Sequence, residues 1–208
     1  MKAWVVASSA SKGGVGKTSV AVAVAACLSR HLKVVVADSD PQGTASLWSA
    51  AGKLPFPVVP VASEADIRAL AAQYQLVVVD CPPQVDAPVM TAALACADLA
   101  LVPLAPEPAD LWATTLLLQR CATDFPQLRK LVVLNRVPSG TALARDVLAS
   151  IENAGWPLAK SRLGQRIAYK ETMAVGGTLD DLKGPGAAKA RQEVQDLALE
   201  VMTTLSSL

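Results

Sequence analysis

Aromatic residues and histidine are scarce in this sequence. Aromatic side chains make up 4% of the 208 residues, and His31 is the single histidine. The apolar fraction of 52% therefore comes mainly from alanine, valine and leucine, and charged residues account for only 18%. This balance excludes an intrinsically disordered chain and is typical of a well-buried globular protein. Valine- and leucine-rich runs favour helices that cover a parallel sheet.

Clustered cysteines are also absent. The four cysteines are widely separated and no Cys-x-x-Cys pair occurs; they are Cys27, Cys81, Cys96 and Cys121. Because the sequence has one histidine, a zinc or iron–sulfur site within one chain is not expected. We expect free thiols in a reducing cytosol.

The sequence has neither a strong net charge nor an uninterrupted apolar span. Lysine and arginine number 19 and aspartate and glutamate 18, which excludes a global basic field but allows a local basic patch. The most apolar stretch, residues 87–105, contains Asp98 and two prolines. It predicts a core helix and a core strand, not a membrane span. The N-terminus enters a strand pattern directly, without the features of a signal peptide.

Short apolar runs alternate with helical patterns along the chain. The apolar runs predict strands at Ala3–Ala7, Val34–Ala37, Val58–Val61, Leu76–Val79, Ala100–Pro103 and Leu131–Leu134, with a further short strand near Pro157–Ala159. Helical spacing predicts helices at about Lys17–Arg30, Gly43–Ala51, Glu64–Gln73, Pro88–Cys96, Leu111–Asp124, Thr141–Ala154 and Ala187–Leu205. The alternation predicts an α/β fold: a three-layer sandwich with a mostly parallel central sheet and helices on both faces. We expect one domain, 1–208, whose ligands bind at the carboxyl ends of the strands.

A glycine-rich loop joins the first predicted strand to the first helix. Residues 11–19 read Ser-Lys-Gly-Gly-Val-Gly-Lys-Thr-Ser. In such a loop the backbone N–H groups and the helix dipole converge on phosphate oxygens. Lys17 is expected to reach the β- and γ-phosphates, and the Thr18 hydroxyl to bind Mg²⁺. The motif predicts a nucleoside triphosphate bound by Lys12, Gly13, Gly14, Val15, Gly16, Lys17, Thr18 and Ser19.

The loop departs from the usual G-x-x-x-x-G-K-[ST] pattern. Ser11 replaces the first glycine, and a second lysine, Lys12, follows it. The sequence Lys-Gly-Gly-Val-Gly-Lys-Thr resembles the deviant Walker A motif of the ParA/MinD family. In that family the additional lysine crosses a dimer interface to the nucleotide of the partner subunit. The resemblance therefore implies a P-loop ATPase in which Lys12 is catalytic.

Two aspartates follow the strand predicted at Val34–Ala37. The segment Asp38-Ser39-Asp40-Pro41-Gln42-Gly43 brings two carboxylates beside the phosphate loop. Such a pair suits a role in orienting water or holding magnesium through water, and an ordinary Asp/Pro turn is the alternative. The segment resembles the D-x-D-P-Q-G box of ParA proteins, whose second aspartate is required for hydrolysis. The resemblance implies that Asp40 is catalytic and that Asp38 contacts the metal through water.

Polar residues also end two other predicted strands. Leu76–Val79 is followed by Asp80-Cys81-Pro82-Pro83, the Walker B form in which a strand delivers a carboxylate to magnesium. This ending resembles the D-[TC]-P-P motif of ParA relatives, where the next segment is a switch that senses the γ-phosphate. Asn135 follows Leu131–Leu134, and its amide suits an adenine edge, which a residue at this place contacts in the family. An asparagine in a loop turn is the alternative for Asn135.

The resemblance extends over nearly the whole chain. Segments 103–108 and 169–179 also resemble the family, and the chain is most similar to short ParA proteins of the ParF type, which have no N-terminal helix-turn-helix domain. This implies a slow, partner-stimulated ATP hydrolase that uses ATP, ADP and Mg²⁺ and forms a homodimer in the ATP state. It also implies a cytoplasmic protein that binds nucleoid DNA nonspecifically, acts with a ParB-like or other cargo adaptor and does not bind membranes. Plasmid or chromosome partition is the leading hypothesis.

A basic stretch in the C-terminal part is the candidate DNA face. It contains Lys160, Arg162, Arg166 and Lys170, with no acidic residue between positions 160 and 170. Lysine and arginine bind DNA phosphates without regard to sequence, and such binding falls steeply with salt. A solvated rim without a ligand is the alternative.

Several alternative functions share parts of this pattern. A positioning ATPase for carboxysomes, chemoreceptor arrays or conjugative DNA has the same motifs and a different cargo. A MinD-like membrane switch needs a basic amphipathic C-terminal helix, whereas this sequence ends in Thr-Thr-Leu-Ser-Ser-Leu. A nitrogenase-reductase-like ATPase needs paired cluster cysteines. An amidoligase of this fold needs an added substrate domain, for which 208 residues leave no room.

Overall fold

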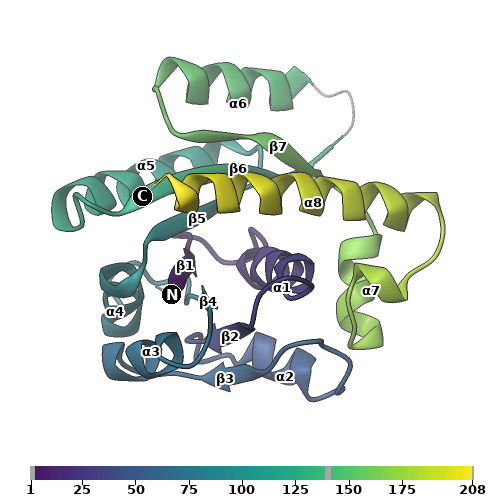
Figure 1. Cartoon of the computed structure of the whole chain (residues 1–208). Helices are drawn as coiled ribbons and strands as arrows, with labels where there is room; N and C mark the ends of the chain where they lie inside the picture. The colour runs from purple at the N-terminus through teal and green to yellow at the C-terminus, as the bar shows by residue number, and fades with distance from the viewer. Residues whose placement is uncertain (1–2, 139–141, 208) are drawn as a thin grey trace.

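Runs of valine and leucine form the central strands of the sheet. The computed structural model describes residues 3–138 and 142–207, and within them seven strands pair in the order β3-β2-β4-β1-β5-β6-β7. Each of these pairings is parallel, as predicted (Figure 1). The strands are β1 Trp4–Ser8, β2 Val34–Asp38, β3 Val58–Pro60, β4 Leu76–Asp80, β5 Leu99–Leu104, β6 Arg129–Val137 and β7 Leu158–Gly164. Every residue of β2, β4 and β5 is buried, which explains their apolar sequences.

Helices cover both faces of the sheet, so the fold is the predicted three-layer sandwich (Figure 1). One cluster of buried side chains lies between the sheet and helices α1, α2, α7 and α8. A second cluster lies between the other face of the sheet and helices α3, α4, α5 and α6. The helices are α1 Lys17–Leu28, α2 Thr44–Ser49, α3 Glu64–Ala71, α4 Pro88–Cys96, α5 Pro108–Asp124, α6 Ala142–Asn153, α7 Ala168–Val175 and α8 Pro185–Ser206, with a 3-10 helix, η1, at Leu179–Asp181. Along β1, Val6 points to the first cluster and Val5 and Ala7 to the second, because strand side chains alternate.

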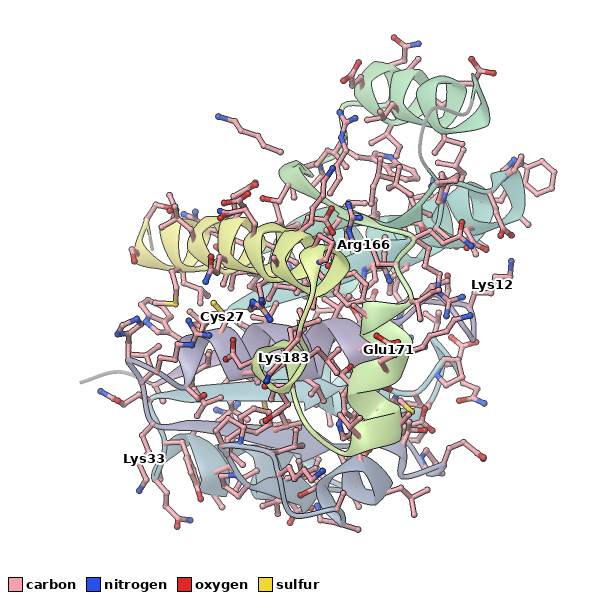
Figure 2. The ribbon with its side chains drawn as sticks, turned by 90° about the vertical axis from the view of Figure 1, so that its right-hand side faces the viewer. Lys12, Cys27, Lys33, Arg166, Glu171 and Lys183 are labelled. Carbon is pink, nitrogen blue, oxygen red and sulfur yellow. The ribbon has the colours of Figure 1, made fainter. Side chains whose placement is uncertain are left out.

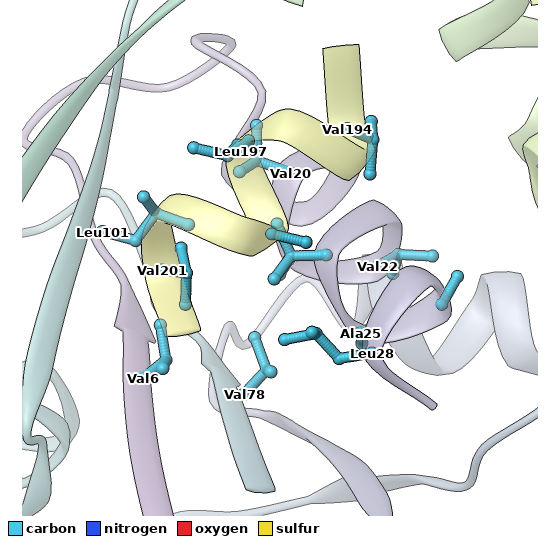
Figure 3. Close-up of a cluster of buried hydrophobic side chains, with 14 of the residues drawn as sticks. Val6, Val20, Val22, Ala25, Leu28, Val78, Leu101, Val194, Leu197 and Val201 are labelled. Atoms are coloured by element: carbon cyan, nitrogen blue, oxygen red, sulfur yellow. The ribbon is translucent and has the colours of Figure 1, made fainter. Parts of the chain in front are cut away.

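The last helix, α8, packs with α1 against the middle of the sheet. Val194, Leu197 and Val201 of α8 share one buried cluster with Val20 of α1 and Val78 of β4 (Figure 3). The prediction that this helix packs in the core is therefore confirmed. No helix in the described part of the chain is both long enough and apolar enough to cross a membrane.

The start of α5 differs from the prediction. The helix begins at Pro108 and not at Leu111, because proline is well suited to the first helical position. The earlier start brings Asp110 into the first turn. The predicted start of α6 at Thr141 lies outside the described residues, and that helix is described from Ala142.

All four cysteines are free thiols, as predicted. Cys81 and Cys121 are buried, whereas Cys27 and Cys96 are partly exposed. Burial raises the pKa of each thiol above its ordinary value. The cysteines therefore remain protonated at neutral pH and act as small apolar side chains.

Candidate functional site

The parallel register brings three polar residues into one row at the carboxyl edge of the sheet. Ser8 pairs with Asp80 across β1 and β4, and Asp38 pairs with Asp80 across β2 and β4. Ser39 donates its backbone N–H and its hydroxyl to the Asp80 carbonyl, at 3.0 and 2.8 Å. The N–H of Cys81 donates to the Ser8 carbonyl at 3.2 Å. These bonds fix two carboxylates beside the loop that follows β1.

That loop forms an open cradle at the same edge. Gly14 and Gly16 have φ values of 81° and 96°, a left-handed conformation that favours glycine. A Cβ at Gly13 or Gly14 would meet no other described residue within 4 Å, apart from its chain neighbours. No side chain caps the N-terminus of α1, which begins at Lys17. The N–H groups of its first turn are therefore available to an anion, as the phosphate-loop motif predicts.

Lys17 places a buried ammonium group under the cradle. The residue is 7% exposed, and its Nζ donates to the Lys12 carbonyl at 3.2 Å. Burial lowers the pKa of Lys17, while the carboxylates of Asp80 and Asp40 act to raise it. The ammonium thus lies close to both the loop and the acids. This position fits a lysine that binds the phosphates of a nucleotide.

Asp80 is a buried carboxylate near the Thr18 hydroxyl and the Lys17 ammonium. It is fully buried, and neither of its carboxylate oxygens has a donor in hydrogen-bonding geometry within the described residues. Burial raises the pKa of Asp80 to about 7, against the opposing effects of the Thr18 hydroxyl and the Lys17 ammonium. Buried carboxylates are ordinarily paired or bound to a metal. A magnesium ion beside phosphates fits Asp80 and the nearby Thr18 hydroxyl, because this metal prefers oxygen ligands.

The two aspartates after β2 have different surroundings. One oxygen of Asp38 accepts hydrogen bonds from the N–H and the hydroxyl of Ser46, at 2.8 and 2.7 Å. Asp38 therefore fastens the first turn of α2, and its contact with a metal through water stays a prediction. Asp40 is half-buried and accepts a bond from the Gln42 N–H at 3.0 Å. Its carboxylate also acts to raise the pKa of Lys17, and its catalytic role stays a prediction.

Asn135 lies against the back of the cradle. Its Nδ2 donates to the Val15 carbonyl at 2.8 Å, and its Oδ1 accepts from the Arg136 N–H at 2.9 Å. A Cβ at Gly16 would lie 2.3 Å from this Nδ2, so only glycine fits there. Asn135 thus supports the phosphate loop, and a contact with the base is not needed to explain its position.

A pocket partly open to solvent adjoins this side of the loop. Its position next to the cradle suits the nucleoside of a bound nucleotide. Arg136, at its wall, has φ of 56°, a left-handed backbone that is uncommon outside glycine. Other lining residues are Gly16, Ser19, Val20, Asn135, Leu163, Gly164, Gln165, Arg166, Tyr169 and Lys170.

Lys12 lies outside the cradle, near the rim of the molecule in Figure 2. Its side chain is 43% exposed, and its Nζ forms an ion pair with Asp110 in the first turn of α5. The sequence motifs do not point to Asp110, because the helix was expected to begin one residue after it. Pro108, three residues before that expected start, is the sequence signal for the earlier start.

The four candidate DNA-binding residues are divided between two places. Lys160 and Arg162 are exposed on β7, which is longer than predicted and forms an edge of the sheet. Arg166, labelled in Figure 2, forms a two-bond ion pair with Glu193 of α8, at 2.6 and 3.0 Å. Lys170 is exposed on α7 and lines the pocket with Arg166. Three of the four side chains are therefore exposed, and Glu193 pairs with the fourth, so their role in DNA binding stays a prediction.

Comparison with known proteins gives a consistent picture. The profile of the CobQ/CobB/MinD/ParA nucleotide binding domain matches residues 6–179. "Maintenance of carboxysome distribution protein A" of Halothiobacillus neapolitanus is 29% identical over 211 residues, with 97% of each chain covered. "Protein ParA" of Rhizobium radiobacter is 26% identical over 217 residues, again with 97% of each chain covered. A Borrelia burgdorferi structure described as a plasmid partition protein bound to AMPPNP has a TM-score of 0.78 at 16% identity, over 96% of this chain and 100% of that one.

Substitution of Asp80 tests the unpaired carboxylate. Its folded-state pKa of about 7 lies above the ordinary 3.8, so ionisation destabilises the nucleotide-free fold. At pH 3.5 the group is mainly protonated in both states, and the full penalty, on the order of a few kcal/mol, is present above pH 7. In urea unfolding, Asp80→Asn should exceed wild type in stability at pH 8 and match it at pH 3.5. Equal stability at pH 8 would contradict the assignment.

Substitution of Asn135 separates loop support from base recognition. Loss of its bond to Val15 should weaken the cradle for every nucleotide, so Asn135→Ala should lower the affinities for ATP and GTP by a similar factor, about tenfold. Titration with ATP and with GTP measures the ratio of the two affinities in the variant and in wild type. Asn153→Ala, at an exposed site on α6, is the matched control. A selective loss of ATP affinity would show instead that Asn135 reads the adenine.

Proposed function

This chain belongs to the CobQ/CobB/MinD/ParA family of nucleotide-binding domains, and we propose that it is an ATPase that dimerises on ATP, binds DNA without sequence preference and positions a cargo. The observation that carries the proposal is the unpaired, buried Asp80 beside an uncapped helix N-terminus and Lys17. The uncapped helix N-terminus and the Lys17 ammonium favour an anion, and the Asp80 carboxylate beside them favours a cation. ATP with Mg²⁺ supplies both.

The residues of the cradle have separate tasks in this function. The first-turn N–H groups of α1 and the Lys17 ammonium bind and orient the phosphates. Thr18 and Asp80 would hold Mg²⁺, which would supply positive charge to the phosphates. Asp40, close to Lys17 and half-buried, orients the attacking water. Asp38 keeps the first turn of α2 in place through its bonds from Ser46.

Dimerisation follows from the position of the second lysine. The Lys12 side chain lies outside the cradle, and its ammonium is paired with Asp110 of α5 and not with the site of its own subunit. In the proposed dimer, Lys12 reaches the phosphates of the partner, where positive charge stabilises the transition state. Hydrolysis then depends on the second subunit, and the ATP and ADP states present different surfaces.

The DNA face is proposed at the exposed edge formed by β7. Lys160 and Arg162 are solvent-exposed there, and a dimer doubles their number. Arg166 is a weaker candidate, because Glu193 neutralises its charge. Nonspecific binding through a small number of such contacts is weak and sensitive to salt.

The proposed cargo is a protein body such as a carboxysome. The carboxysome-distribution relative from Halothiobacillus neapolitanus supports this choice, since its similarity extends over 97% of both chains. A plasmid is the second candidate, supported by the ParA relative from Rhizobium radiobacter. Imaging of carboxysomes and measurement of plasmid loss after gene deletion distinguish the two cargoes.

Substitution of Asp40 tests the hydrolytic half of the cycle. Because Asp40 is assigned to the attacking water and not to nucleotide binding, Asp40→Ala should retain ATP binding and lose at least about 100-fold in hydrolysis rate. The variant should remain on DNA after ATP addition, whereas wild type dissociates as ATP is consumed. Phosphate release and DNA retention are measured on the same samples. Unchanged hydrolysis would remove Asp40 from the mechanism.

A paired substitution tests the DNA face. Lys160→Ala combined with Arg162→Ala should weaken ATP-dependent binding to duplex DNA. The slope of the logarithm of the binding constant against the logarithm of the salt concentration should fall by about two per subunit. The matched control, Lys53→Ala with Lys183→Ala, removes the same charge from other exposed positions (Lys183 is labelled in Figure 2). Equal losses in the two double variants would indicate a general charge effect and reject the β7 edge as the DNA face.

A further inference from the structure

The start of the phosphate loop is tied to the beginning of α5. The Lys12 ammonium forms its ion pair with Asp110 and lies 3.8 Å from the more exposed Glu107 carboxylate. The hydroxyl of the preceding Ser11 donates to the Ala113 carbonyl at 2.6 Å. Two adjacent residues of the loop therefore contact the first two turns of the same helix.

The two members of the ion pair have very different surroundings. The Asp110 side chain is 4% exposed and lies in the first turn of α5, whereas the Lys12 side chain is 43% exposed. Lys12 is the one cation in contact with Asp110 among the residues that the structure describes. The hydrogen bond to Asp110 raises the pKa of Lys12, so the ammonium remains charged. Loss of Lys12 would leave a buried carboxylate without its counterion.

The same helix also contacts the segment that follows Asp80. The Arg120 guanidinium donates to the Val85 carbonyl and to the Thr91 hydroxyl, the latter at 2.7 Å. It also lies 3.6 Å from the Asp86 carboxylate. α5 therefore joins the loop that carries Lys12 to the segment next to the proposed magnesium ligand.

We infer that Asp110 is a positioning residue that holds Lys12 on its own subunit and releases it only when a second subunit presents a nucleotide. The inference rests on the proposed function, in which Lys12 acts on the partner's phosphates. It assigns to Asp110 the task of preventing dimerisation before both nucleotides are bound.

Charge compensation explains why release needs a nucleotide. Lys12 has to break its pair with a buried carboxylate before it can cross to the other subunit, and that step is unfavourable by itself. The phosphates of a bound triphosphate carry several negative charges and provide a stronger partner for the ammonium. ADP lacks the γ-phosphate and provides a weaker one. The intramolecular pair therefore favours the monomer except in the ATP state.

The test compares dimerisation of Asp110→Asn with that of wild type. Sedimentation velocity with AMPPNP and Mg²⁺ measures the protein concentration at which half of the full-length chain is dimeric. The variant should dimerise at about tenfold lower concentration, because the competing pair is gone. Asp180→Asn, which removes the exposed ion pair with Arg30, is the matched control and should behave as wild type.

A second measurement shows whether the effect acts through Lys12. Carbon-13 NMR of the dimethylated lysine reports the pKa of Lys12 in the nucleotide-free monomer, which should be raised in wild type and fall in Asp110→Asn. The gain in dimerisation should disappear when Lys12→Ala is combined with Asp110→Asn. A gain that persists in this double variant would indicate a general structural effect and overturn the inference.

The outcomes separate the inference from the proposed function. If wild type dimerises with AMPPNP and Asp110→Asn dimerises equally or less well, the inference is overturned and the proposed function stands. If wild type remains monomeric with AMPPNP at every concentration, the proposed function fails, and the inference fails with it.

Discussion

The register of three parallel strands determines the geometry of the whole site. Because β1, β2 and β4 are paired without offset at their carboxyl ends, Ser8, Asp80 and Asp38 lie in one row. The phosphate loop leaves β1 at that row, so its glycines and Lys17 meet the acids without any long connection. A shift of one residue in β4 would turn Asp80 to the other face of the sheet and separate it from the loop.

The site combines charges that the fold alone does not satisfy. Asp80 is buried without a partner, Lys17 is buried near two acids, and the first turn of α1 has no cap. Functional sites commonly keep such unsatisfied groups at the expense of stability. Here each group is complementary to one part of a magnesium nucleotide, so ligand binding both stabilises the fold and completes the site.

Much of this arrangement could be predicted because it is local in the sequence. Buried strands read as runs of valine, and the glycine loop and the acids follow those runs directly, so the sheet and the cradle were both expected. Pairings between distant segments left no such pattern: Arg166 binds Glu193 on α8, and Lys12 binds Asp110 on α5. Lys12 and Arg166 were predicted as cations that act on phosphates. In the structure each one is paired with an acid that lies far from it in the sequence.

The central claim is that a triphosphate at this edge makes the chain a DNA-binding dimer through Lys12. The most direct measurement is the binding of nonspecific duplex DNA with ATP, ADP or no nucleotide, at two salt concentrations, for wild type and Lys12→Ala. We predict binding that requires ATP, weakens steeply with salt and is lost in Lys12→Ala. DNA binding that is equal with ADP or without nucleotide, or an ATP dimer that does not bind DNA, would contradict the account.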